Sequence, residues 1–143
     1  MVRPDKVENT LSNLKGYLEK LKRLAILSRE EFLSDFTKVE SAKHLFQVSV
    51  ECCIDVANHI IASERFPVPK SYAESFETLA EKGILPNNFV PTLRQMVQFR
   101  NRLVHLYWDV DAEVIHELLQ RNLTDFDPFA KHILDYMANT KSE

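Results

Sequence analysis

Apolar side chains recur along this chain at intervals of three and four residues, the spacing of amphipathic helices. The first such stretch covers residues 5–27. Ser28 followed by Glu31 then forms the pattern of a capping box, which starts a second helix. We expect this second helix to run without interruption to about Ser63, because it contains no Gly or Pro. Its middle is apolar on nearly every side, so it should be the central and most buried element.

Four further helices are predicted in the second half of the chain. One is capped by Ser71 and ends at Gly83, since glycine readily adopts the left-handed conformation that closes a helix. The next begins at about Pro91 and continues through the segment FRNRLVHLYWDVD, residues 99–111. The last two are expected to begin near Asp111 and Thr124.

The composition agrees with a helical, globular protein. Only two of 143 residues are glycine, and 45% are apolar, which favours few turns and one well-filled core. The sequence therefore predicts an all-α fold, an antiparallel helical bundle of five to six helices, in a single domain of residues 1–143. No uninterrupted apolar run is long enough for a membrane span, and no signal-peptide core is present. The adjacent Cys52 and Cys53 are expected to be reduced, which favours a cytoplasmic location.

Residues 99–111 carry the candidate chemistry. The net charge of −3 argues against a large, non-specific nucleic-acid surface but leaves room for a local basic site. On a helical wheel, Arg102 points to solvent, whereas Arg100 lies near the centre of the apolar arc. A guanidinium there is unfavourable unless it pairs with a carboxylate or faces an anion. Two interpretations follow: a structural ion pair with another helix, or an anion-binding site.

Arg100 and His105 point about 140° apart on a continuous helix. To act on the same ligand, they need a helix that ends near His105, or two copies of the chain facing each other across a two-fold axis. A composite site in a homodimer is therefore a prediction of the functional interpretation.

A second polar face lies on the central helix, where Glu51, Asp55 and His59 recur at every fourth residue. A hydrogen-bonded polar seam is the simpler interpretation, and the polar wall of a pocket is the other. No metal site or cofactor is predicted, because the chain lacks the spacings of zinc ligands, a phosphate-binding glycine loop and a nucleophile elbow.

The segment RNRLVHLY, residues 100–107, resembles the R-x4-H-x-Y form of the motif of HEPN-domain proteins, as found in HepT-type toxins. The flanking segments ECCIDVANHIIA and PVPKSYAESFETLAEKGILP are similar to the central helix and linker of that family, so the similarity covers about residues 40–135. The resemblance implies a HEPN-like bundle that dimerises around the R-x4-H helix and cleaves RNA without a metal ion. It also implies a partner, a minimal nucleotidyltransferase (MNT) antitoxin, which can AMPylate a tyrosine that maps to Tyr107.

The residue types suit that chemistry, in which the 2′-hydroxyl of RNA is the nucleophile. We assign Arg100 to stabilising the phosphate and transition state, and His105 to general acid–base catalysis. Asn101 is expected to orient the His105 ring or the phosphate. Tyr107, on the Arg100 side of the helix, is expected to lie where an added AMP would crowd and charge the site. The alternatives are a non-catalytic module that docks a nucleotidyltransferase or a nucleotide, and a structural helical dimer with Arg100 in a salt bridge.

Overall fold

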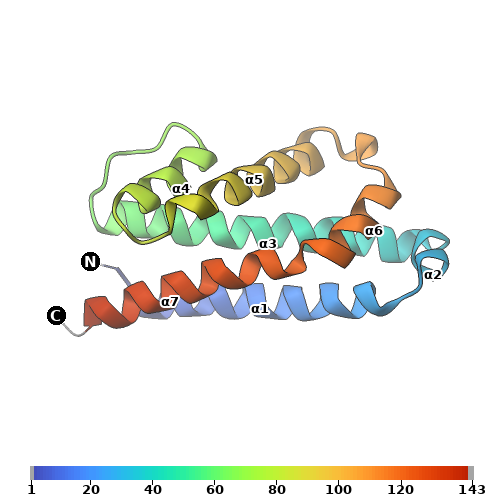
Figure 1. Ribbon diagram of the computed structural model, residues 1–143, viewed down its shortest axis with the longest axis horizontal. Helices are drawn as coiled ribbons and strands as arrows, with labels where there is room; N and C mark the ends of the chain where they lie inside the picture. The colour runs from blue at the N-terminus through green and yellow to red at the C-terminus, as the bar shows by residue number, and fades with distance from the viewer. Residues whose placement is uncertain (1, 142–143) are drawn as a thin grey trace.

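Helices form most of residues 2–141, the part of the chain that the computed structural model describes (Figure 1). That part contains no β-strand, so the all-α prediction is confirmed. The α-helices are α1 (Pro4–Ile26), α2 (Arg29–Leu33), α3 (Phe36–Ser63), α4 (Tyr72–Glu81), α5 (Val90–His105), α6 (Ala112–Arg121) and α7 (Asp127–Lys141). Three short 3₁₀-helices are η1 (Asn87–Phe89), η2 (Tyr107–Asp109) and η3 (Leu123–Phe126).

The predicted second helix is broken into α2 and α3, and in this respect the prediction was wrong. Its start is as expected: the Glu31 amide donates to the Ser28 hydroxyl at 3.1 Å, and the Ser28 amide donates to the Glu31 carboxylate at 3.3 Å. The helix stops after little more than one turn because Asp35 caps a new one. The Asp35 backbone is extended, and its carboxylate accepts a hydrogen bond from the Thr37 amide at 2.9 Å. Aspartate competes with helical hydrogen bonds in this way.

Gly83 closes α4 as predicted. Its φ is +75°, in the left-handed region that glycine tolerates. The Gly83 amide donates to the Ala80 carbonyl at 3.0 Å, and the Ile84 amide donates to the Leu79 carbonyl at 2.9 Å. This pair of bonds is the Schellman motif, which satisfies carbonyls that the helix end would otherwise leave unpaired.

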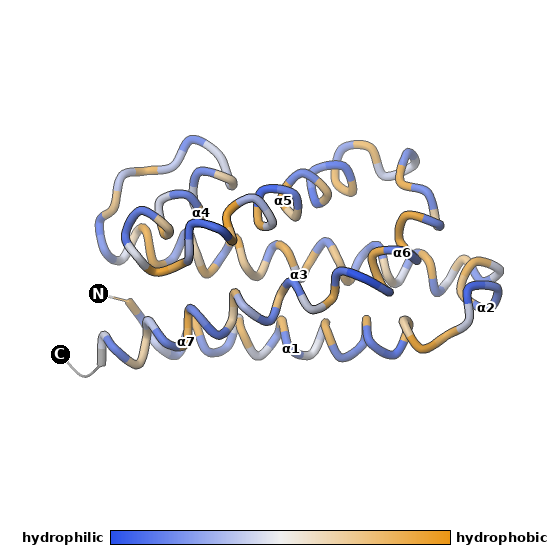
Figure 2. Tube along the Cα trace, in the orientation of Figure 1, coloured by the Kyte–Doolittle hydropathy of each residue, from blue (hydrophilic) through white to orange (hydrophobic). Residues whose placement is uncertain are grey.

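The central element is α3. In Figure 1, α4 and α5 lie along one side of it and α1 along the other. The helix α7 lines a shared hollow with α1, and its last turn lies at the same end of the molecule as the start of α1. Figure 2 shows apolar positions along the whole length of α3, and 13 of its 28 residues are buried. By length and composition α3 could also cross a membrane, but 61% of its most apolar 18-residue window is buried within the protein. Packing in the core therefore accounts for its apolar character.

The helix α5 ends at His105, rather than continuing through residues 99–111 as predicted. Leu106 leaves the helical conformation, with φ −134° and ψ 45°, and the 3₁₀-helix η2 follows. The Arg102 guanidinium donates to the Asp109 carbonyl at 3.5 Å across this turn. Asp111 then caps α6 by accepting a hydrogen bond from the Glu113 amide at 3.3 Å. The turn places His105 at the free end of a helix, and this decides the geometry of the candidate site.

Candidate functional site

An open hollow of about 600 Å³ lies beside the C-terminal part of α5. Its lining comes from α3, from α4 with the segment before it, and from α5. The lining residues are Asn58, Pro69, Lys70, Ser71, Tyr72, Ser75, Arg100, Asn101, Val104 and His105. None of them is acidic, whereas Lys70 and Arg100 each carry a full positive charge. The hollow is therefore suited to an anion.

Hydrogen bonds and an ion pair fix α4 as one wall of this hollow. The Ser75 hydroxyl donates to Asn58 Oδ1 of α3 at 2.7 Å, and Arg94 of α5 forms an ion pair with Glu77 of α4. Ser71 caps α4 by accepting a hydrogen bond from a first-turn amide at 3.1 Å. The N-terminal end of α4, where the helix dipole is positive, thus borders the hollow and adds to its attraction for negative charge.

Arg100 is only 16% exposed, and its guanidinium contacts three side chains. Its Nη2 lies 3.7 Å from Glu51 Oε2 on α3, its Nη1 donates to Asn101 Oδ1 at 3.2 Å, and its Cζ lies 5.3 Å from the centre of the Tyr72 ring. The carboxylate that the structural interpretation required is therefore present. Arg100 Nε is buried and has no hydrogen-bond partner among residues 2–141. A guanidinium has five N–H donors, so the ion pair leaves donors for a further ligand.

His105 is exposed and lines the same hollow as Arg100 and Asn101. The sequence required either a helix end near His105 or two facing copies, and the first condition is met within one chain. The two residues assigned to catalysis, Arg100 and His105, and the supporting Asn101 thus line one hollow. A homodimer is not required to bring them together, and it stays a prediction.

Two lining residues, Lys70 and Tyr72, were missed from the sequence. They lie just before and at the start of α4, 28 or more positions from Arg100. Neither residue shares a helix with Arg100, so the helical period does not relate their positions. Only the packing of α4 against α5 places them in the same hollow as Arg100. The aromatic ring of Tyr72 presents its face to Arg100, a cation–π contact that helps to hold the charge in place.

The polar face of α3 divides between two sites. Glu51 turns to Arg100 and accepts a hydrogen bond from the Gln47 amide at 2.9 Å. Asp55 and His59 instead line a separate hollow of about 430 Å³ between α1 and α3. Both interpretations of this face are thus partly correct, since it is a hydrogen-bonded seam and also a pocket wall. No group of three side chains in residues 2–141 is arranged to hold a metal ion.

His59 joins the start of α1 to α3, because its Nε2 accepts a hydrogen bond from the Arg3 backbone amide at 3.2 Å. Burial lowers the pKa of His59, and the positive charges of Lys6 and Arg3 lower it further. Burial raises the pKa of the neighbouring Asp55, with the charge of Glu51 acting in the same direction. Neither residue contacts the hollow at α5.

Tyr107 does not lie beside Arg100, contrary to the helical-wheel prediction. Its hydroxyl donates to the Glu40 carboxylate on α3. Glu40 and Glu51 are eleven residues apart, which is about 16 Å along a helix axis. Tyr107 and Arg100 therefore contact α3 at well-separated points. The wheel failed because it assumed a helix that continues past His105.

A buried lysine holds Tyr107 in this position. Lys43 is 7% exposed. Its Nζ lies 4.4 Å from the centre of the Tyr107 ring and donates to the Tyr107 carbonyl at 3.4 Å. Lys43 and Glu40 were not predicted from the sequence, because a lysine and a glutamate three residues apart on a helix are ordinary surface residues.

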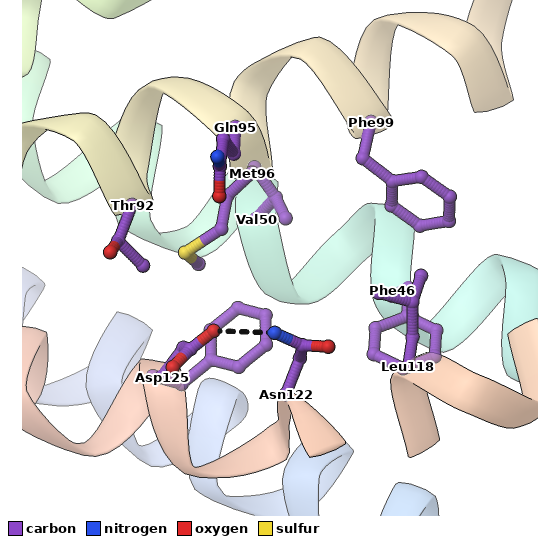
Figure 3. A pocket seen from close by; sticks show the side chains of 10 residues that line it. Phe46, Val50, Thr92, Gln95, Met96, Phe99, Leu118, Asn122 and Asp125 are labelled. Atoms are coloured by element: carbon purple, nitrogen blue, oxygen red, sulfur yellow. Dashed lines mark hydrogen bonds between the residues drawn. The ribbon is translucent and has the colours of Figure 1, made fainter. Parts of the chain in front are cut away.

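A further pocket, between α3, α5 and the α6–η3 segment, has a different character (Figure 3). Phe46 and Phe99 meet edge to face at its end, with ring centres 6.0 Å apart. At its rim the Asn122 amide donates to the Asp125 carboxylate at 3.0 Å, as the dashed line in Figure 3 shows. Its volume is only about 90 Å³ and its one charged residue is acidic. It is not suited to a phosphate, in contrast to the hollow at α5.

Comparisons with known proteins identify the relatives of this chain. Residues 14–133 match the HepT-like family, described as ribonuclease HepT-like. The mRNA nuclease HepT of Shewanella oneidensis is 29% identical over 125 residues, which are 87% of this chain and 93% of that protein. The tRNA nuclease HepT of Aphanizomenon flos-aquae is 26% identical over 144 aligned residues, 99% of this chain and 97% of that protein. The tri-AMPylated HEPN toxin of Shewanella oneidensis, solved in complex with an MNT antitoxin, superposes with a TM-score of 0.84 and 28% identity over 93% of this chain and 99% of that one.

Proposed function

The chain belongs to the HepT-like ribonuclease family, and we propose on this basis that it is a cytoplasmic toxin that cleaves RNA without a metal ion. The observation that carries the proposal is the hollow at α5, where Arg100, Asn101 and His105 meet in a lining that contains no carboxylate. A phosphodiester is an anion that fits such a lining. The two relatives named as mRNA and tRNA nucleases support RNA as the substrate class.

In the proposed reaction the 2′-hydroxyl oxygen attacks the adjacent phosphorus and the 5′-oxygen leaves, which yields a 2′,3′-cyclic phosphate. Arg100 donates to the phosphate oxygens, on which negative charge increases in the transition state. Glu51 pairs with the guanidinium at 3.7 Å and helps to hold it in place. His105 transfers a proton to or from a reacting oxygen, and its exposure at the end of α5 leaves the ring accessible to RNA. Asn101 orients the guanidinium through its hydrogen bond.

We further propose that two copies of the chain associate near the end of α5. One imidazole cannot act as acid and base in the same step, and a second copy would supply another. Three large apolar side chains within three residues of His105 along the chain are exposed: Val104 at 39%, Leu106 at 43% and Trp108 at 77%. Exposed apolar side chains gathered at one place are typical of an interaction surface.

The proposed partner is an MNT-type nucleotidyltransferase antitoxin that transfers AMP to the Tyr107 hydroxyl. The toxin in the similar complex carries AMP groups and is bound to an MNT antitoxin, which supports the assignment. Tyr107 stands two residues after His105 in the chain, in the turn that follows α5. An adenylyl group there adds a negative phosphate, which repels the RNA backbone.

The test is an RNA-cleavage assay in EDTA with the chain purified free of its partner. We expect cleavage products that end in 2′,3′-cyclic phosphate, and loss of cleavage in Arg100→Ala and His105→Ala proteins whose circular dichroism is unchanged. Full activity in both folded variants would refute the assignment of the site.

A second candidate function is a non-catalytic module that binds a nucleotidyltransferase or a nucleotide. It is favoured by one observation, that Arg100 already has a carboxylate partner in Glu51. Under this hypothesis AMP or RNA binds at the hollow and Arg100→Ala weakens the binding, but no product forms even with excess protein. The same EDTA assay therefore separates the two functions.

A further inference from the structure

Two charged side chains contact Tyr107, Glu40 and Lys43, and the proposed RNA cleavage uses neither of them. The Glu40 carboxylate, on the exposed side of α3, accepts the hydroxyl proton in a hydrogen bond. Lys43 holds the other end of the residue, with its ammonium group against the ring and on the backbone carbonyl. Neither Glu40 nor Lys43 lines the hollow at α5. Lys43 thus holds the ring and backbone of Tyr107, while the hydroxyl contacts an exposed carboxylate.

A tyrosine hydroxyl needs such a partner if it is to accept an adenylyl group. Its ordinary pKa is about 10, so only about one molecule in a thousand is ionised near pH 7. The neutral phenol is a weak nucleophile, and it must lose its proton as the oxygen bonds to phosphorus. A carboxylate already in hydrogen-bond contact with the attacking oxygen can take that proton.

We propose that Glu40 is the general base for adenylylation of Tyr107, and that Lys43 is a positioning residue for the tyrosine. The proposal rests on the proposed function, in which a nucleotidyltransferase delivers AMP from ATP. The Tyr107 oxygen forms a bond to the α-phosphorus, and the bond from that phosphorus to the pyrophosphate oxygen breaks. Pyrophosphate leaves with the electron pair, and the phenolic proton passes to the Glu40 carboxylate. The acceptor chain thus supplies the base, and the transferase supplies the nucleotide.

The other charged groups near the hydroxyl do not suit this role. Asp109 lies in the same turn and is exposed, but it is the Asp109 backbone carbonyl that is hydrogen-bonded, and its carboxylate does not contact Tyr107. Lys43 is a cation and lies over the face of the ring rather than at the oxygen. Glu40 is therefore the group in contact with the reacting atom.

The experiment measures the initial rate of adenylylation by intact mass, with the modified residue mapped by peptide mass spectrometry. The purified chain is incubated with ATP and the MNT antitoxin of a HepT-type pair over a range of pH. Glu40→Gln is the test variant, because an amide oxygen still accepts the hydroxyl hydrogen bond but is not a base. Asp109→Asn is the matched control, since it removes one negative charge from the same turn without touching the hydroxyl. Tyr107→Phe gives the background.

We expect Tyr107→Phe to remain unmodified at this position and Asp109→Asn to react at the wild-type rate. Glu40→Gln should react about 10²–10⁴-fold more slowly near pH 7, the usual contribution of a general base. That defect should shrink as the pH rises towards the ordinary phenol pKa of about 10, where the hydroxyl ionises without help. Lys43→Met should slow the reaction by the same factor at every pH, because it disturbs position and not proton transfer.

The outcomes separate this inference from the function on which it rests. If wild type and Glu40→Gln are modified on Tyr107 at equal rates, the role of Glu40 is wrong and the role of Tyr107 stands. A defect in Glu40→Gln that is constant with pH also overturns the base, because a merely structural residue would act in that way. A wild-type chain modified elsewhere, or not at all, overturns both. An unchanged rate in Lys43→Met removes the positioning role alone.

Discussion

Replacing Arg100 with methionine removes the guanidinium and keeps most of the length of the side chain. The structural loss is the ion pair with Glu51 at 3.7 Å. The Coulomb energy of two unit charges at that distance is about 4 kcal/mol with an effective dielectric constant of 20. Desolvation of both groups and screening by water reduce the net value, because the two side chains are 16% and 31% exposed. We expect a net loss of about 1–2 kcal/mol in the free energy of unfolding.

That loss is too small to abolish activity through unfolding. A domain with the low typical stability of about 5 kcal/mol would keep about 3 kcal/mol, and about 99% of it would stay folded. The catalytic loss is larger if Arg100 stabilises charge on the phosphate, since removal of one such donor lowers kcat by about 10²–10³-fold. The two interpretations of Arg100 therefore predict rates that differ by about two orders of magnitude.

The assay combines urea unfolding, followed by circular dichroism, with single-turnover RNA cleavage in EDTA. Arg94→Met is the matched control, because Arg94 is on the same helix and pairs with Glu77 of α4, but does not line the hollow. It should lose at most about 1 kcal/mol, as exposed pairs do, and keep its cleavage rate within about twofold. If Arg100→Met cleaves RNA as fast as Arg94→Met, Arg100 is only a structural ion pair and the proposed role is wrong.

Three further predictions follow from single side chains. His105→Gln should change the unfolding free energy by no more than about 0.5 kcal/mol, because the ring is exposed. The same variant should cleave RNA about 10²–10⁴-fold more slowly, and normal cleavage would contradict the role of His105. The pKa of His59 is lower in the folded protein than the value of about 6.5 expected in the unfolded chain. The folded protein is therefore most stable above that pH, and it loses stability as the pH falls below it, because the unfolded chain then binds the proton more readily. Urea midpoints measured across this window should therefore fall less steeply in His59→Gln, and parallel profiles would refute the link. Trp108→Ala should leave the urea midpoint unchanged, because the side chain is 77% exposed. It should also weaken self-association at least about tenfold, as measured by sedimentation. A wild-type chain that stays monomeric at all concentrations would refute the dimer.

Local sequence determined where several helices begin and end and which helix is buried. The capping box at Ser28 and the left-handed Gly83 depend on residues within one turn of the helix end, so the sequence is sufficient to predict them. The periodic pattern likewise identified α3 as the buried centre. Asp35 was missed, although a cap residue carries a local signal, because no Gly or Pro accompanied it. The unusual position of Arg100 was also visible, since the helical period alone places it on the apolar arc.

Only the tertiary structure decided what Arg100, His105 and Tyr107 contact. The pattern of residues 99–111 contains no helix breaker, yet α5 ends at His105 and the following turn rests on α3. The contacts of Tyr107 with α3 join residues 64 and 67 positions apart, Lys43 to its carbonyl and its hydroxyl to Glu40. Such contacts depend on how two helices pack and not on the period of either one. The sequence thus indicated a charged helix end as a candidate site. Packing against α3 and α4 divided it into a hollow suited to an anion and a separately held tyrosine.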